Sequence, residues 1–243
     1  MRRITEAGVL KFRRRHERLH RGRIRKALIK SFQRFWNAVD DIGMSDAFKL
    51  INTLADPEPV EKAISTTISE VARISARAVD RDLKADFDVW FDPLLQQYLI
   101  DTMFYKVVGI QDSSINIIGR FVQQYQSQIT DLSINPQTLA LQFMREWEGL
   151  SRMRAIRIAR TEVASAANFG TLKAIENSEV VDTKTWNSVL QKNTRDMHRE
   201  MHGTTIGKTE KFLMPNGDTM DHPLDFNGSA ENVVNCQCYL TFD

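Results

Sequence analysis

One stretch decides the fold: residues 151–177 read SRMRAIRIARTEVASAANFGTLKAIEN. Apolar residues recur there every three or four positions, which predicts a helix with one apolar side. Many of the apolar residues are alanines, so we expect another element to approach this helix closely. The positions expected to face inward are Met153, Ile156, Ala159, Val163, Ala166 and Ala167.

The character of the sequence changes after this helix. Residues 180–189 and 233–242 have the apolar, β-branched composition of strands, and Gly, Pro, Asn and Asp are frequent between them. Together with the helix they predict a compact α+β module at residues 151–243 with a few short strands. We expect Trp186, Phe212 and Leu240 to lie in its core.

Residues 44–150 form a predicted helical middle region. Its clearest helix is 60–78, where apolar residues follow a helical period. The aromatic-rich segment 86–109 is expected to be helical but broken at Pro93. Further helices are expected at 118–129 and from Asn135-Pro136 to Gly149, where proline at the first helical position and a closing glycine are typical helix boundaries.

Residues 1–43 form a predicted basic helical arm. Residues 1–30 contain twelve basic and two acidic residues, a net charge of +10, whereas the whole chain has +2, so the other 213 residues carry −8. The helix is expected from about Glu6 to Val39. Four arginines are spaced along one side of it: Arg14, Arg18, Arg21 and Arg25.

Composition excludes several classes of protein. The chain has 243 residues, 42% hydrophobic and 26% charged, as in ordinary globular proteins and unlike disordered chains. It lacks an apolar run long enough for a spanning helix, and no apolar segment follows the basic start as in a signal peptide, so we expect it to stay in the compartment that makes it. Its two cysteines exclude a disulfide scaffold.

Candidate catalytic groups are scarce. The sequence shows no nucleophile with a visible base, no glycine-rich phosphate loop and no carboxylate pair at an acid/base spacing. Arg154, Arg157 and Arg160 recur at intervals of three and require anionic partners. We expect salt bridges to acids of the same module, such as Glu162, Asp182 or Asp225, with an anion or nucleic-acid site as the alternative.

A candidate metal site involves the two cysteines. On a helix, His198 and His202 share a side, and on a strand Cys236 and Cys238 share a side. Brought together, they would give the soft ligand set of structural zinc. The alternative is that His198 is hydrogen-bonded to backbone or carboxylate and the cysteines pack as small apolar residues.

A set of short motifs then resembles a known family, the phage Mu protein F-like minor head proteins. The similarity covers their C-terminal module, at residues 151–243 of this chain. The motifs, in order, are Arg157-Ile158-Ala159-Arg160-Thr161-Glu162, Asn168-Phe169-Gly170, Lys184-Thr185-Trp186, Thr194-Arg195-Asp196-Met197-His198, His202-Gly203, Phe212, Pro223-Leu224-Asp225 and Asn235-Cys236-Gln237-Cys238.

The resemblance implies a structural minor head protein of a tailed bacteriophage that acts in head morphogenesis and is no enzyme. It implies the portal protein as a partner, with major capsid or scaffold protein and genomic DNA as further candidates and no membrane. The expected location is the virion head interior or portal vertex, and the host bacterial cytoplasm during assembly. The family usually has arginine where this chain has Gln237, so no role of that cation carries over.

Three functional hypotheses follow. The first is the structural head protein, with Arg157, Arg160, Glu162 and Arg195 forming a polar network in the module. The second is a nucleic-acid-binding module that contacts phosphates, or a portal surface, through the arm. The third is an enzyme: a metal-dependent hydrolase or nuclease site at His198, His202 and the cysteines, or a nucleotide-handling cleft at the arginine row and Glu162. The contact residues expected in the arm are Arg13, Arg14, Arg18, Arg21 and Arg25.

Overall fold

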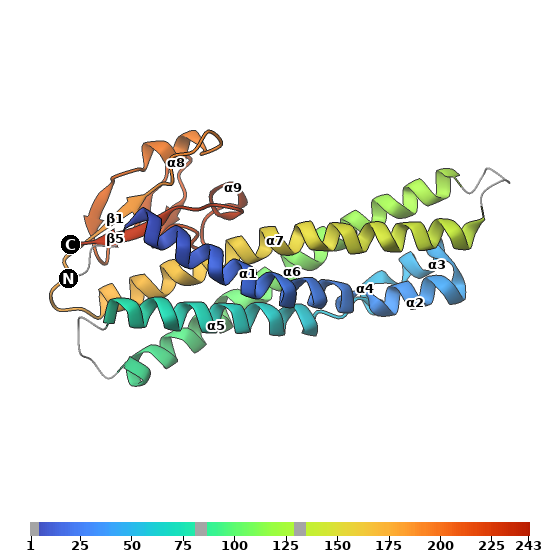
Figure 1. Ribbon diagram of the computed structural model, residues 1–243, viewed down its shortest axis with the longest axis horizontal. Coiled ribbons are helices and arrows are strands. Elements are labelled where there is room, and N and C mark those ends of the chain that lie inside the picture. Colours follow the sequence, from blue (N-terminus) through green and yellow to red (C-terminus); the bar gives the residue numbers. More distant parts are fainter. Residues whose placement is uncertain (1–4, 81–86, 129–134) are drawn as a thin grey trace. The chain divides into compact units, whose positions relative to one another are not determined.

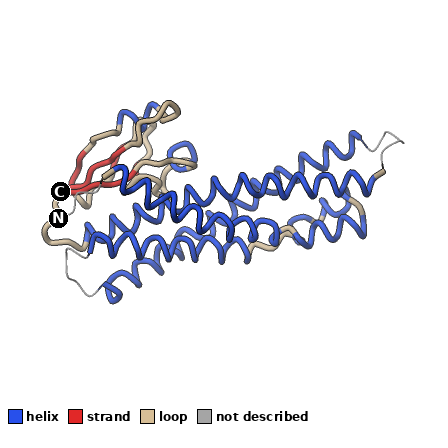
Figure 2. Tube along the Cα trace, in the orientation of Figure 1, coloured by secondary structure: helices blue, strands red, loops and turns tan. Residues whose placement is uncertain are grey.

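The computed structural model describes residues 5–80, 87–128 and 135–243, and residues 1–4 of the predicted arm lie outside this range. The fold is α+β, as predicted: long helices, then a region with short antiparallel strands (Figures 1 and 2). The helices are α1 Glu6–Ser31, α2 Gln33–Ile42, α3 Met44–Lys49, α4 Ile51–Leu54, α5 Glu58–Asp80, α6 Phe87–Gln128, α7 Pro136–Glu176, α8 Asp196–Glu200 and α9 Ala230–Val233. The strands are β1 Thr183–Asn187, β2 Thr205–Gly207, β3 Phe212–Leu213, β4 Thr219–Met220 and β5 Tyr239–Phe242.

Two predicted helix boundaries are wrong. Helix α6 runs through Pro93, and α7 runs through Gly149. Proline removes one backbone hydrogen bond, but Phe91 and Leu95 on either side of it are fully buried, and their burial offsets the cost. Around Gly149, the buried Trp147 and Ala155 hold the helix in the same way, against a glycine penalty of about 1 kcal/mol.

The chain divides into two compact units. Unit 1 comprises residues 1–20, 65–101 and 157–243, and unit 2 comprises residues 21–64 and 102–156. The predicted division at residues 43 and 150 stays a prediction. Among the described residues, no helix is both long and apolar enough to span a membrane.

Unit 2 has an aromatic core. The rings of Phe32 and Trp147 meet edge to face at 5.2 Å, and those of Phe121 and Phe143 stack at 5.3 Å. These side chains come from the chain around α2, from α6 and from α7, and all are buried. Met153 of α7 was expected to face inward but is 63% exposed. In this unit the buried side of α7 is the one that carries Trp147 and Ala155, and Met153 lies off it.

The strands of unit 1 form two small antiparallel sheets. One has the order β2-β1-β5, with Trp186 opposite Leu240, and the other pairs β3 with β4. Trp186, Phe212 and Leu240 are buried in one cluster with the two cysteines, which confirms the predicted core. The side chain of Trp186 meets the Phe212 ring edge to face at 5.4 Å, so sheet and hairpin share this core.

Helices α5 and α7 approach closely within unit 1. A Cβ atom added to Gly170 of α7 would lie 2.2 Å from the carbonyl oxygen of Ala72 in α5. The approach requires glycine at this position, and the small residues Ala166 and Ala167 precede it on α7. The expectation of a close neighbour along the alanine-rich helix is therefore met.

Candidate metal centre

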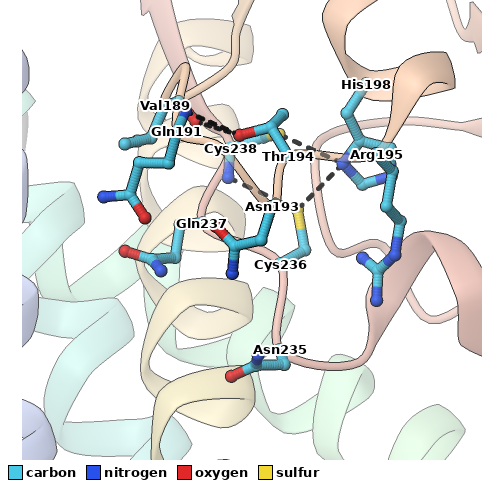
Figure 3. A pocket seen from close by; sticks show the side chains of 10 residues that line it. All are labelled: Val189, Gln191, Asn193, Thr194, Arg195, His198, Asn235, Cys236, Gln237 and Cys238. Carbon is cyan, nitrogen blue, oxygen red and sulfur yellow. Dashed lines mark hydrogen bonds between the residues drawn. The ribbon is translucent and has the colours of Figure 1, made fainter.

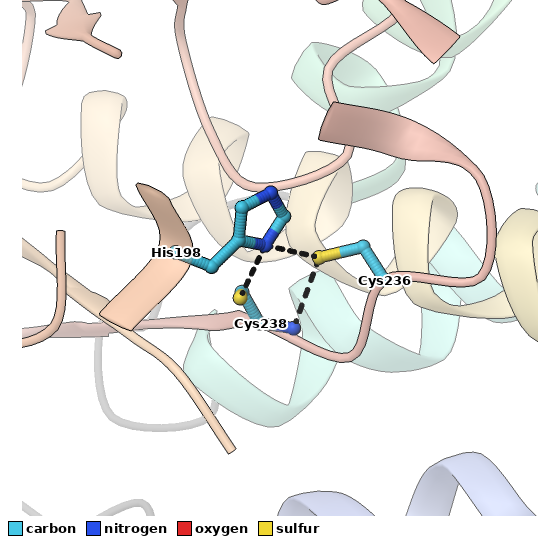
Figure 4. Close-up of side chains that lie close together, drawn as sticks. All are labelled: His198, Cys236 and Cys238. Carbon is cyan, nitrogen blue, oxygen red and sulfur yellow. Dashed lines mark hydrogen bonds between the residues drawn. The ribbon is translucent and has the colours of Figure 1, made fainter. Parts of the chain in front are cut away.

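Three buried side chains of unit 1 converge on one point. The Nδ1 atom of His198, in α8, lies 3.3 Å from Sγ of Cys238 and 3.4 Å from Sγ of Cys236 (Figure 4). All three candidate ligand atoms lie within 4.8 Å of one another, and no other such group of three occurs among the described residues. The nitrogen and the two sulfurs thus lie close enough together that one metal ion could contact all three.

A tight turn held by α7 brings the cysteines to this point. Asn235 has a positive φ of 60°, a conformation that asparagine tolerates better than most residues. Its backbone N–H donates to Oγ1 of Thr161 at 2.9 Å, and its side-chain oxygen accepts from Nη1 of Arg160 at 2.9 Å. The Arg160-Thr161 pair thus fixes the start of the segment that carries the ligands.

Asn232 sets which nitrogen of His198 is available. The amide nitrogen of Asn232 donates to Oδ2 of Asp218 at 2.7 Å and to Oδ1 of Asn216 at 3.1 Å. Its oxygen therefore faces Nε2 of His198 at 3.1 Å, and that nitrogen must carry the hydrogen. Nδ1 is left with a free lone pair towards the sulfurs, which is how protein ligands orient a metal-binding histidine.

The two thiols differ in acidity. The hydrogen bond with the Cys236 thiol, together with the interactions with His198 and Ser188, lowers the pKa of Cys238, whereas burial, together with the Cys238 interaction, raises the pKa of Cys236. The backbone N–H of Cys238 also donates to Sγ of Cys236 at 3.3 Å. The pair thus shares one thiolate, and a bound divalent cation would favour losing the second proton as well.

Arg13 lies behind the cysteine segment. Its Nη1 donates to the carbonyl oxygens of Gln237 at 2.8 Å and Cys238 at 3.1 Å, and Nη2 donates to Oδ1 of Asn168 at 2.9 Å. Burial lowers the pKa of this guanidinium to about 10, and the two thiols act in the opposite direction. Arg13 is 2% exposed, so it departs from its predicted role as a surface contact to DNA or portal.

His202 does not join the cluster. Helix α8 ends at Glu200, so His202 is not one helical turn beyond His198, as the prediction required. Its Nδ1 instead accepts the backbone N–H of Ser188 at 3.1 Å. The cysteines also precede strand β5 rather than lying in it, and the turn at Asn235 aligns their thiols in place of strand geometry.

The predicted arginine partners differ from the observed ones. Nε of Arg160 lies 3.5 Å from Oε2 of Glu17 in α1. Arg157 is exposed, and Nη2 of Arg195 donates to the carbonyl of Val234 at 2.8 Å. Asp225 was expected to pair with one of the three regularly spaced arginines of α7. It instead accepts the N–H groups of its own turn, from Asp221 at 2.7 Å and Asn227 at 3.2 Å.

Other predicted positions are distributed over the two units. Glu162 is 6% exposed. In unit 2, Nη2 of Arg154 donates to Ser113 and Ser114, each at 2.9 Å. The predicted contact arginines of the arm other than Arg13 are exposed, two in each unit: Arg14, Arg18, Arg21 and Arg25.

Sequence reasoning missed the residues that position the ligands. Asn232 is fully buried, and its side chain links His198 to Asp218. Asn168 donates to the carbonyls of Pro223 at 2.7 Å and Cys238 at 3.1 Å. Asn168 stood in one of the resemblance motifs, which was the available signal, whereas nothing in the sequence marked Asn232.

A small pocket opens beside the three ligands (Figure 3). Its volume is about 100 Å³. Its wall includes His198, Cys236 and Cys238. The other lining residues are Val189, Gln191, Asn193, Thr194, Arg195, Asn235 and Gln237.

Comparison with known proteins gives one family and one relative. The model of the family described as Phage Mu protein F like protein matches residues 117–241. The uncharacterized protein YqbB of Bacillus subtilis (strain 168) is 32% identical over 101 residues, 40% of this chain and 33% of that protein. The match thus spans about a third of the relative's length. No solved structure matches the chain significantly.

Proposed function

Because the chain belongs to the Phage Mu protein F-like family, whose model matches about half of it, we propose that it is a structural minor head protein of a tailed bacteriophage. The family suggests a role in phage head morphogenesis. The observation that carries the proposal is the match over residues 117–241, which includes both cysteines and the helix α7 that holds their turn.

We place the protein at the portal vertex or in the head interior, with the portal protein as its partner. Two features support this placement. The chain carries a basic N-terminal segment, suited to an acidic protein surface or to DNA. The buried cluster in unit 1 is fixed by hydrogen bonds on several sides, as expected of a rigid structural part.

The test is co-purification from procapsids that lack DNA. We expect the chain to be recovered with the portal protein from such particles and to be absent from particles without portal. Recovery only from DNA-filled heads, with release on nuclease treatment, would contradict portal association and favour the second candidate below.

The second candidate function is contact with packaged DNA. Arg14, Arg18, Arg21 and Arg25 are exposed and remain available for phosphates. Changing all four to Gln should weaken binding and make the salt dependence shallower by about 0.9 per lost contact in log–log form. A gel-shift salt titration measures both quantities, and equal affinity and slope would exclude this contact. Substitution is preferable to truncation at residue 43, which would also remove the buried Arg13.

We further propose that His198, Cys236 and Cys238 hold a structural zinc ion. Thiolate and imidazole ligands suit zinc, and the second nitrogen of His198 is already fixed by Asn232. Metal analysis of the purified protein should find zinc, and a chelator should lower the melting temperature of unit 1. The Cys236→Ser variant should lose both the metal and the chelator response, whereas His202→Gln, outside the cluster, should keep them.

The same preparation tests the absence of catalysis. A structural protein should not nick plasmid DNA with or without chelator. Chelator-sensitive nicking that is lost in Cys236→Ser would favour the metal-dependent hydrolase instead.

A further inference from the structure

The candidate metal centre has three protein ligands within reach and faces a pocket. Zinc takes four ligands, and structural sites usually take all four from the protein, whereas sites with three keep a position open. Within the described residues, no further His, Cys, Asp or Glu belongs to the cluster. His202, the predicted fourth ligand, is engaged with the backbone of Ser188.

The pocket has the size and polarity for a small ligand. Its volume of about 100 Å³ has room for about three water molecules at about 30 Å³ each. Apart from Val189 and the cysteines, the lining residues carry amides, a hydroxyl, an imidazole or a guanidinium (Figure 3). A single carboxylate group fits such a space.

The charges around the centre favour an anion. Two thiolates would neutralise a divalent ion, and the buried Arg13 guanidinium behind the cysteine segment has the carboxylate of Glu17 acting on it. Arg195 adds a positive charge to the pocket wall, and no carboxylate lines it. An anionic fourth ligand would offset the positive charge of Arg195 on this wall.

We propose that the metal keeps its fourth coordination position open to this pocket and that an exchangeable carboxylate ligand occupies it. The inference rests on the zinc site proposed above. It gives the centre a second role besides stabilising unit 1: an acidic side chain of a partner protein can bind the metal directly.

Cobalt substitution of the full-length protein tests the open position. Co²⁺ in a site with two thiolates gives a charge-transfer band in the near ultraviolet and d–d bands in the visible range. Titration with acetate should shift the visible bands in a saturable manner while the charge-transfer band remains. Visible bands that do not change at high acetate concentration would show a closed site and overturn the inference.

Variants locate the response in the pocket. Arg195→Gln should raise the Kd for acetate about fivefold, as expected for the loss of one partly exposed charge, with unchanged Co²⁺ affinity. Lys192→Gln removes a neighbouring exposed charge outside the pocket wall and should leave the Kd unchanged. Equal effects of the two substitutions would contradict binding in this pocket.

His202→Gln distinguishes an open site from one that His202 closes. We expect the same cobalt spectrum and acetate response as in the unsubstituted protein. An acetate response that appears only in His202→Gln would identify His202 as the fourth ligand and overturn the inference. Failure of Co²⁺ and Zn²⁺ to bind at all would overturn both this inference and the zinc proposal, whereas the head protein assignment is tested separately by co-purification.

Discussion

At the scale of single residues, the neighbours Arg13 and Arg14 have different roles. Arg14 is exposed, whereas Arg13 is 2% exposed and donates hydrogen bonds to two carbonyls of the cysteine segment and to Asn168. These three hydrogen bonds offset part of the cost of burying the cation, whose Nε has no hydrogen-bond partner among the described residues. Arg13 therefore links the first half of α1 by hydrogen bonds to the segment that contains Cys236 and Cys238.

Substitution of Arg13 tests this role. Arg13→Met keeps much of the apolar stem but removes three hydrogen bonds and takes from the carbonyl of Gln237 the donor that Arg13 supplies, so we expect a loss of about 1–3 kcal/mol in the free energy of unfolding. Arg14→Met should change it by less than about 0.5 kcal/mol. Chemical denaturation of both variants measures the difference. Equal stabilities would show that the hydrogen bonds of Arg13 do not stabilise the fold.

His222 predicts a pH dependence of stability. It is 2% exposed, its Nδ1 lies 2.9 Å from the carbonyl of Pro223, and burial lowers its pKa below 6.5. Asp225 and Asp221 oppose this shift, and Lys184 reinforces it. Below about pH 6.5 the unfolded chain takes up a proton that the folded chain does not, so stability is lost as the pH falls.

The slope can be measured directly. The contribution of His222 is at most about 1.4 kcal/mol per pH unit. Urea denaturation between pH 7 and pH 5, roughly either side of an ordinary histidine pKa, measures how the free energy of unfolding falls with pH. This fall should be smaller for His222→Gln than for the unsubstituted protein. Parallel slopes would mean that His222 does not contribute. Burial also lowers the pKa of His16, which acts in the same direction and remains in both proteins.

Of the four ligands that the sequence suggested, the structure brings together His198, Cys236 and Cys238, which were chosen because His and Cys are the residue types that bind zinc and the two cysteines are close in the chain. Sequence reasoning assigned His202 wrongly because that assignment assumed a helix through residue 202, and α8 ends at Glu200. It missed Asn232 and the interior place of Arg13 because both depend on contacts between distant segments. Arg13 is 225 positions from Cys238.

At the scale of elements, the contact between α5 and α7 has the strictest steric requirement, because it leaves no room for a side chain at Gly170. Gly170→Ala would place a Cβ atom 2.2 Å from the carbonyl oxygen of Ala72, so the two helices would have to move apart. We expect a loss of about 2–3 kcal/mol in the free energy of unfolding. Denaturation measures it, and unchanged stability would contradict the close approach.

Gly149 provides the control on the same helix. A Cβ atom there would meet nothing within 4 Å, so Gly149→Ala should raise helix stability by about 0.5–1 kcal/mol. A loss of stability in this variant would mean that α7 is interrupted at Gly149, as the sequence had suggested.

The sequence predicted most elements but joined or divided several wrongly. The helical periods were correct, and so was the change to strands near residue 180. Pro93 and Gly149 were read as boundaries because local propensity favours an ending there, but the buried residues on either side keep α6 and α7 continuous. The arm, predicted as one helix to Val39, ends its first part at Ser31, and α2 begins at Gln33.

Arg160→Ala should be milder than the sequence indicated. From sequence we expected a buried carboxylate partner and a loss of about 3–5 kcal/mol. The side chains of Arg160 and Glu17 are 32% and 18% exposed, so water screens the pair. With the hydrogen bond to Asn235 included, the expected loss falls to about 1–2 kcal/mol, measured by denaturation. A loss of about 3–5 kcal/mol would instead indicate that Arg160 pairs with a buried carboxylate.

At the scale of the whole molecule, the contrast between a basic start and an acidic remainder was evident from composition, and the α+β class followed from periodicity. The division into two units was not predictable, because each unit combines segments that are distant in the sequence. The two units also divide α1 between them, with Arg13 in unit 1 and Arg21 and Arg25 in unit 2. The segment is therefore part of both folded units as well as a candidate contact surface.

The most direct test of the central claim is a density map of the assembled phage head. We expect density for this chain at the portal vertex or in the head interior, in particles with and without DNA. Density on the outer surface of the shell or on the tail, or no density for the chain in any assembled particle, would contradict it.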